Sequence, residues 1–207
     1  MISVRRLTFP LCLIALSSSL IQAQDLSSYR DFRFGMKLGA VAKKAGMNPA
    51  EVKTLHQRPV LIQELWWRHS FASSLPEKDA IREVVFSFYN GALFRMVVNY
   101  DRNRTEKLTD EDMIQAISAK YGIAIRPVAT IVLFSTAHVY NDNEKVLARW
   151  EDSRYSYNLY RSFNQPAFGM LVFSKRLDAL AQTAIAKAIQ LDNQIPQRES
   201  DRPKKEE

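Results

Sequence analysis

The chain has 207 residues, 46% of them hydrophobic and 25% charged, and its formal net charge is +7 at pH 7. That length suits one domain with a core large enough to need no disulfide. The basic residues are scattered along the chain, which is typical of a solvated surface. The single cysteine, Cys12, falls in a segment that we expect to be removed, which excludes disulfides, thiolate catalysis and cysteine metal sites from the mature chain.

Residues 1–23 have the pattern of an export signal. Arg5 and Arg6 precede an apolar stretch, residues 7–20, and small residues follow toward Ala23. The apolar stretch is shorter than the ~20 residues that span a bilayer. We therefore expect cleavage after Ala23, a periplasmic or secreted mature protein, and no membrane span after signal removal. Retention of the segment as an N-terminal anchor is the alternative.

The mature chain is predicted to form one α+β domain over residues 24–194. The elements expected from hydrophobic periodicity and from start and stop signals are, in chain order, a strand at 32–36, a helix at 38–45, a strand at 61–67, a hairpin at 82–101, a helix at 110–121, strands at 146–150, 155–163 and 168–173, and a helix at 175–193. The pattern at 130–134 is ambiguous between a strand and a loop and is not counted in this order. The order β-α-β-β-β-α-β-β-β-α indicates a mostly antiparallel sheet of about six to seven strands, with two to three helices packed on one face. Residues 195–207 are rich in charge and are expected to be disordered.

The hairpin at residues 82–101 is predicted to be the centre of the sheet. Its turn lies at Asn90-Gly91, a pair typical of hairpin loops. A two-residue loop would place Phe86 opposite a polar residue. We therefore expect a three-residue loop that also includes Tyr89 and that pairs Phe86 with Phe94.

The helix at residues 110–121 has the strongest local signals. Thr109 is a typical N-cap, and Asp112 three residues later completes a variant of the capping box. Gly122 is expected to end the helix.

Two groups of residues resemble known families. Phe34-Gly35-Met36, leading into a helix with Val41, resembles the opening of small exported bacterial helix-plus-strands domains, among them the β-lactamase inhibitor protein and assembly lipoproteins of the SmpA/OmlA type. The stretches at 84–101, 108–122, 147–162 and 177–191 resemble an exported bacterial family of unknown function. The first resemblance implies a binding or assembly module, and the second implies a fold and a compartment.

No catalytic, cofactor or metal motif is recognisable. The three histidines, His56, His69 and His138, are far apart, and neither a nucleophile elbow nor a phosphate-binding glycine loop is present. The acidic runs at 110–112 and 151–152 are explained by helix capping and by a turn. We therefore predict no cofactor and no metal. The stretch at 167–173 is close to the base-stacking strand of RNA-recognition domains, but it lacks the leading basic residue and glycine, which favours a core strand and disfavours nucleic acid as a partner.

Adjacent strand residues point to opposite faces of a sheet, so Trp66 and Trp67 cannot both face one core. We expect one of them on a helix-free face, where it would join other aromatic and arginine side chains into a binding surface. The candidate binding residues are Trp66, Trp67, Tyr89, Arg95, Tyr160 and Arg161. A second small core, covered by the loop at 69–79 or by the tail, is the alternative.

The preferred hypothesis is a non-enzymatic module that binds an envelope protein or a cell-surface component on this open sheet face. The alternative is a small envelope hydrolase or ligand-binding enzyme that combines His56, His69 or His138 with Glu64 or Asp152. A binder of anionic polymers, motivated by the positive net charge, is a third hypothesis.

The signal pattern predicts that the mature protein begins near Gln24 and is found outside the cytoplasm. Mass spectrometry of the native protein should detect an N-terminal peptide that starts there. Soluble cytoplasmic protein with an intact Met1 would refute the prediction.

Overall fold

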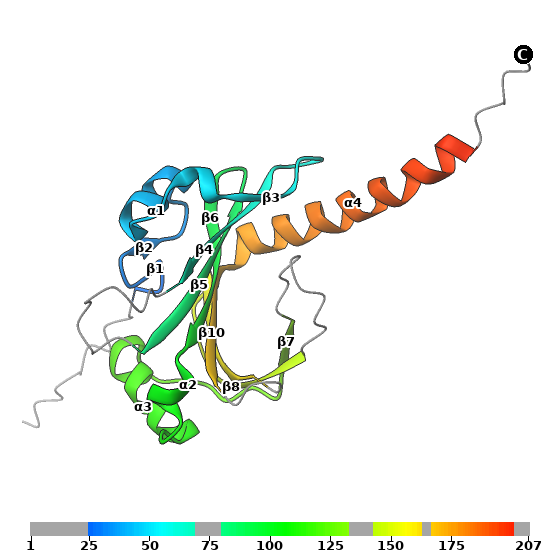
Figure 1. Ribbon diagram of the computed structural model, residues 1–207. Coiled ribbons are helices and arrows are strands. Elements are labelled where there is room, and N and C mark those ends of the chain that lie inside the picture. Colours follow the sequence, from blue (N-terminus) through cyan, green and yellow to red (C-terminus); the bar gives the residue numbers. More distant parts are fainter. Residues whose placement is uncertain (1–24, 69–79, 133–142, 163–166, 201–207) are drawn as a thin grey trace, which may run out of the picture.

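The computed structural model describes residues 25–68, 80–132, 143–162 and 167–200 (Figure 1). Its elements are β1 (Ser28–Tyr29), β2 (Phe32–Arg33), α1 (Leu38–Ala45), the 3-10 helix η1 (Pro49–Glu51), β3 (Lys53–His56), β4 (Ile62–Arg68), β5 (Ile81–Tyr89), β6 (Ala92–Tyr100), α2 (Arg102–Thr105), α3 (Asp110–Tyr121), β7 (Thr130–Val132), β8 (Asn143–Glu151), β9 (Tyr155–Arg161), β10 (Phe168–Ser174) and α4 (Lys175–Ser200). The predicted signal at 1–23 and the predicted loop at 69–79 lie outside the described residues.

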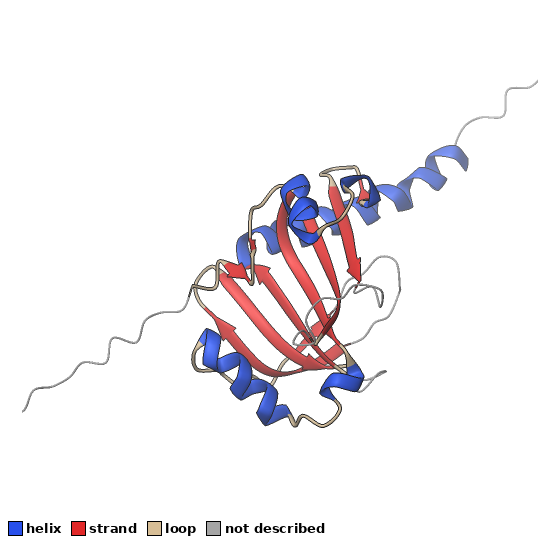
Figure 2. Ribbon diagram, turned by 60° about the vertical axis from the view of Figure 1, so that its left-hand side comes forward, coloured by secondary structure: helices blue, strands red, loops and turns tan. Residues whose placement is uncertain are grey.

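The α+β class is confirmed. β1 and β2 form a small antiparallel ribbon, and the other strands form one antiparallel sheet in the order β3-β4-β5-β6-β10-β9-β8-β7 (Figure 2). This sheet has eight strands rather than six to seven. Its short edge strand β3 was not predicted as a strand, and the predicted strand at 32–36 belongs to the small ribbon instead of the main sheet. Among the described helices, none combines the length and the apolar character of a membrane span.

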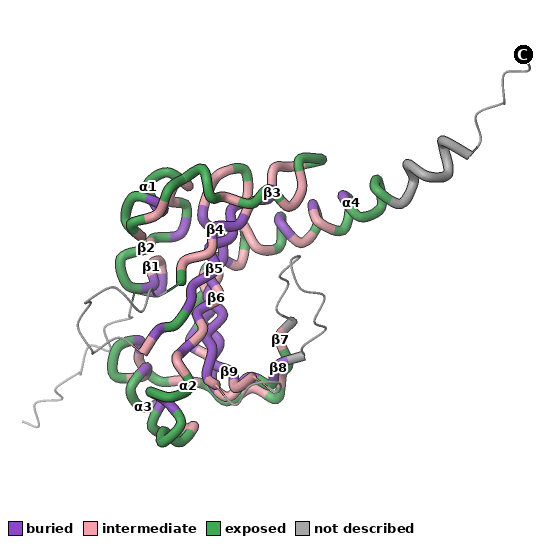
Figure 3. Tube along the Cα trace, viewed as in Figure 1, coloured by how far each residue is buried: buried purple, intermediate pink, exposed green. Residues whose placement is uncertain are grey.

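The two faces of the sheet have different covers. α1 and α3 lie on one face, where Val41, Ile114 and Ile117 join the main core. α4 crosses the other face near β6 and then projects away from the sheet (Figure 1). Ala181 of α4 contacts a smaller core on that face, formed with Ile62 and Phe94. The interior of the sheet is buried and the outer surfaces of the helices are exposed (Figure 3).

The central hairpin has a tighter turn than the predicted one. Asn90 and Gly91 have positive φ angles of 49° and 74°, and Tyr89 pairs with Ala92, so the loop has two residues. The predicted three-residue loop is therefore wrong, as is the pairing of Phe86 with Phe94.

A bulge in β6 explains how the tight turn is compatible with the buried face. Phe88 pairs with Leu93 but Ser87 pairs with Arg95, so Phe94 is an extra residue on β6. The extra residue shifts the register, and Phe86 then lies opposite Met96, both fully buried in the main core. Phe94 and Arg95 are displaced together to the side of α4.

The helix signals are confirmed at α3 and only partly at α4. The Thr109 hydroxyl accepts a hydrogen bond from the Asp112 N–H (3.1 Å), and the Asp112 carboxylate accepts one from the Thr109 N–H (2.8 Å). Gly122 follows the last residue of α3 as predicted. α4 continues to Ser200, past residue 193 where the sequence pattern predicted its end.

Phe86→Ala should lower the free energy of unfolding by roughly 3–5 kcal/mol, because it empties an aromatic core position. The Phe86 side chain is 1% exposed, and its ring centroid lies 4.7 Å from that of Phe32. Arg82→Ala, at an exposed position of the same strand, is the control and should change the free energy by less than about 0.5 kcal/mol. Equal effects in urea denaturation would contradict the observed register.

Candidate functional site

The six predicted binding residues are divided between the two faces of the sheet. Trp67 packs against the main core, on the side of α1 and α3. The Arg161 guanidinium lies on the same side, where its Nε donates to Asp110 Oδ1 of α3 (3.0 Å) and its Cζ lies 4.2 Å from the Phe168 ring centroid. The other four residues, Trp66, Tyr89, Arg95 and Tyr160, lie on the side of α4. The single surface expected from the sequence is therefore not formed.

The face that was expected to be free of helices is partly covered by α4. Arg95 is 6% exposed, and its Nε donates to Asp178 Oδ1 of α4 at 2.7 Å. Tyr160 is 1% exposed, and its hydroxyl donates to Asn99 Oδ1 at 3.2 Å. The Tyr160 ring occupies the space in which a Cβ of Gly169 would lie. Arg95 and Tyr160 thus have structural roles on this face.

Trp66 and Tyr89 are half-buried rather than open platforms. The Trp66 indole donates to Glu64 Oε2 (3.2 Å), and the Arg68 guanidinium lies 5.6 Å from its ring centroid. Tyr89 packs against the small core beneath α4. A second small core is present on this face, and α4 covers it. The loop at 69–79, which the sequence alternative named as a cover, lies outside the described residues.

Buried Glu64 and half-buried Asp178 flank Arg95 on this face. Glu64, Ser87 and Arg95 are cross-strand neighbours on β4, β5 and β6, and Asp178 meets Arg95 from α4. Burial raises the pKa of Glu64, although hydrogen bonds from Trp66 and Ser87 oppose that shift. Burial also raises the pKa of Asp178, against the attraction of Arg95. The group attaches the first turn of α4 to the sheet.

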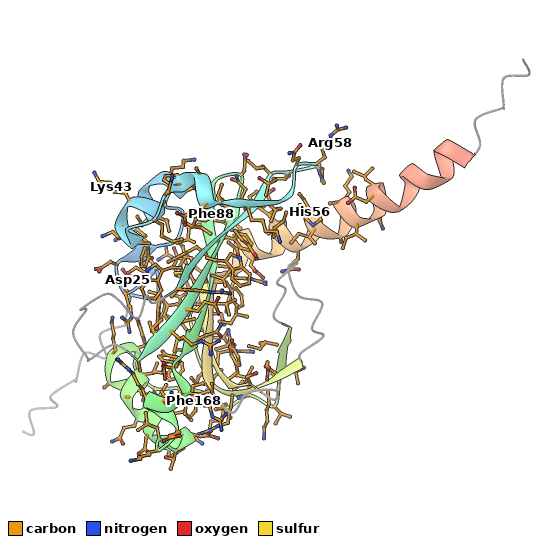
Figure 4. The ribbon with its side chains drawn as sticks, in the orientation of Figure 1. Asp25, Lys43, His56, Arg58, Phe88 and Phe168 are labelled. Carbon is orange, nitrogen blue, oxygen red and sulfur yellow. The ribbon has the colours of Figure 1, made fainter. Side chains whose placement is uncertain are left out.

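The histidine site of the enzyme hypothesis is not assembled from the described residues. His56 is half-buried on β3 (Figure 4), and its Nε2 has no hydrogen-bond partner within the described ranges. The Asp152 carboxylate accepts bonds from the Arg154 and Tyr155 N–H groups in the β8–β9 turn. His69 and His138 lie outside the described residues. In the part of the chain that is described, no three His, Asp or Glu side chains are placed to hold a metal.

A solvent-open cleft of about 530 Å³ lies between the turn that joins β1 to β2 and the helix α3. We call it the tyrosine cleft. Its lining residues are Tyr29, Arg30, Asp31, Tyr100, Ala116, Ile117, Lys120, Tyr121 and Met170. They come from the β1–β2 ribbon, β6, α3 and β10, so the cleft exists only in the folded domain.

Three phenols form the buried wall of the tyrosine cleft. The hydroxyls of Tyr29 and Tyr100 are 3.1 Å apart and share a hydrogen bond. Tyr121 stacks on Tyr29 with ring centroids 6.3 Å apart. The Tyr121 side chain is nine-tenths buried, and its hydroxyl has no hydrogen-bond partner among the described residues. Burial raises the pKa of Tyr29 and of Tyr100, so both phenols stay protonated at neutral pH.

Cationic side chains lie at the mouth of the cleft. The Lys120 ammonium is 5.2 Å from the centroid of the Tyr121 ring, and the Arg30 guanidinium is 5.9 Å from that of Tyr29. Arg30 has a φ of 53°, which is the left-handed conformation of the tight turn between β1 and β2. Asp31 is the acidic residue of the lining.

The sequence analysis did not identify this site. Tyr29, Arg30 and Asp31 precede the first strand that periodicity predicts, while Tyr100 and Tyr121 carry the signature of core residues. The one available signal was the Tyr-Arg-Asp run in a region with no periodic pattern.

Comparisons of the chain with protein-family models, with curated proteins and with solved structures found no match.

Glu64→Gln should raise the melting temperature at neutral pH. Because burial raises the pKa of Glu64, the folded state binds its proton more tightly than the unfolded state does. The ionised carboxylate therefore costs stability as the pH rises through the folded pKa. That cost vanishes below the ordinary value of 4.5, where the carboxyl is protonated in both states. Thermal unfolding at several pH values measures the difference from the unmodified protein.

The matched control is Glu106→Gln, at an exposed position after α2, which should not show this pH-dependent gain. A lower melting temperature for Glu64→Gln at neutral pH would mean that attraction to Arg95 outweighs the cost of burial.

Proposed function

We propose that this protein is an exported, non-enzymatic binding domain whose ligand enters the tyrosine cleft. The observation that carries the proposal is the cleft itself, to which two separate elements, the β1–β2 turn and α3, each bring a cationic side chain that lies over a tyrosine ring of the wall. Its export rests on the signal pattern of residues 1–23.

The size and lining of the cleft support binding of a small ligand. Ligand pockets are typically 300–1,000 Å³ and combine apolar walls with a few placed polar groups. The tyrosine cleft, at about 530 Å³, has Ile117 and Met170 on its apolar side and three phenols on its polar side. The binding surface is thus this cleft rather than the sheet face considered from the sequence.

The described groups in the cleft favour binding over catalysis. General base catalysis needs a group that is deprotonated near neutral pH and held close to the reacting atom. Tyr29 and Tyr100 are held in their protonated form by burial. Asp31, the carboxylate of the lining, is exposed to solvent rather than held in an enclosed site against a reacting atom.

Ala116→Trp should weaken ligand binding because the indole fills the cleft. Ala116 is an exposed residue of α3 that lines the cleft, so the larger side chain does not enter the core. The probe is 8-anilinonaphthalene-1-sulfonate, whose fluorescence rises in apolar sites. We expect its Kd to rise about tenfold or more, which corresponds to about 1.4 kcal/mol.

Ala119→Trp is the matched control, since Ala119 is exposed on α3 but does not line the cleft. This variant should bind the probe like the unmodified protein. Equal binding by all three proteins, or no binding by any of them, would contradict a ligand site in the tyrosine cleft.

A further inference from the structure

We infer that the loop between α3 and β7, residues 122–129, inserts its aliphatic side chains into the surface of a lipid bilayer. We call this segment the aliphatic loop. The inference goes beyond the proposed function, because the exposed aliphatic side chains of this loop do not line the tyrosine cleft.

The aliphatic loop holds the two most exposed large apolar residues of the described chain. Ile123 is 92% exposed and Val128 is fully exposed, while Ile125 between them is 50% exposed. Ala124 packs against the main core, so the isoleucines on either side of it are turned to solvent. Apolar residues that are scattered singly over a surface need no explanation, but a group of them on one segment marks an interaction site.

The backbone of the aliphatic loop is fixed against β8. Ile125 and Arg149 exchange both of their backbone hydrogen bonds, at 2.9 and 2.8 Å. The Val146 N–H donates to the Ala129 carbonyl at 3.0 Å. Pro127, between these two attachments, has no N–H that needs a partner. The exposed side chains are therefore presented by a segment whose backbone is held at two points.

These paired backbone groups favour a lipid surface as the partner. An unpaired N–H or C=O is costly where water cannot reach it, and this cost keeps irregular backbone out of the lipid-exposed hydrocarbon region. In the aliphatic loop the cost is reduced at Ile125, Pro127 and Ala129. The side chains can therefore enter the boundary between headgroups and acyl chains without leaving these backbone groups unpaired.

The charge of the segment is also compatible with a layer of lipid headgroups. Residues 122–132 contain no acidic residue and one basic residue, Arg126. The Arg126 side chain is 58% exposed, although it forms an ion pair with Glu111 of α3. A long cationic side chain beside inserted apolar groups can keep its charged end at the level of the lipid phosphates.

The small size of the exposed group disfavours a protein as the partner. A stable protein–protein interface buries about 800 Å² on each partner and is enriched in aromatic side chains. The aliphatic loop has three exposed large aliphatic side chains and no aromatic one. A lipid surface requires no complementary shape, and the strength of binding to it scales with the apolar area that is buried.

The experiment places an environment-sensitive nitrobenzoxadiazole label on Val128→Cys, in a protein that also carries Cys12→Ala so that the new thiol is the only one. The control is the same label on Lys43→Cys, at an exposed position of α1 (Figure 4). α1 and α3 lie at opposite ends of the main sheet (Figure 1). When phosphatidylcholine vesicles that contain phosphatidylglycerol are added, the label at position 128 should brighten and shift to the blue, and the label at position 43 should not change. This comparison holds whether residues 1–23 are removed or retained.

One substitution tests the aliphatic contact. In the protein labelled at position 128, Ile123→Ser should raise the lipid concentration at half-maximal signal about tenfold, because one large aliphatic side chain no longer leaves water. Ile189→Ser is the matched control, since Ile189 is 50% exposed on α4, outside the aliphatic loop. The control should leave the lipid concentration at half-maximal signal unchanged.

Three results would overturn the inference. The first is a label that responds equally at the two positions, or at neither of them. The second is a midpoint that Ile123→Ser does not move, or that Ile189→Ser moves by as much. The third is a shift at position 128 that grows with protein concentration in the absence of lipid, which would identify a second copy of the chain as the partner. None of these results bears on the tyrosine cleft, whose test depends on Ala116.

Discussion

The pairing of β5 with β6 decides which side chains face the main core, and the rest of the structure depends on it. The tight turn at Asn90 and Gly91 sets the register, and the bulge at Phe94 then corrects it by one residue. Without that extra residue, Phe86 and Met96 would not meet on the same face. The bulge also directs Arg95 to the opposite face, where Asp178 binds it.

The two faces consequently have different chemistry. On the face of α1 and α3, apolar and tyrosine side chains form the main core, and its border with the β1–β2 ribbon is the tyrosine cleft. On the other face, charged groups are buried beneath α4, where Glu64 and Asp178 carry raised pKa values. Buried charges of this kind are costly unless they are paired. The second face is therefore suited to attaching α4.

Much of the fold could be predicted because its signals are local. Thr109 and Asp112, three residues apart, mark the start of α3, and Gly122 marks its end; the turn at Asn90-Gly91 can be predicted from two residues. The bulge could not be predicted from the sequence, because a one-residue insertion in a strand leaves the apolar composition unchanged. The cleft could not be predicted either, because its residues Tyr29, Tyr100 and Tyr121 come together only through tertiary packing. For the same reason Arg95 was predicted to be exposed: its partner, Asp178, is 83 residues away in the chain.

The account centres on the claim that the tyrosine cleft is the ligand site. The most direct test is a titration of the isotope-labelled protein with 8-anilinonaphthalene-1-sulfonate, followed by amide chemical-shift mapping. The account predicts that the largest shifts fall on residues 29–31 of the β1–β2 turn and 116–121 of α3, which are far apart in the sequence and meet at the cleft. Shifts that gather instead around Trp66 and Tyr89 on the α4 side, or that are absent at saturating ligand, would contradict it.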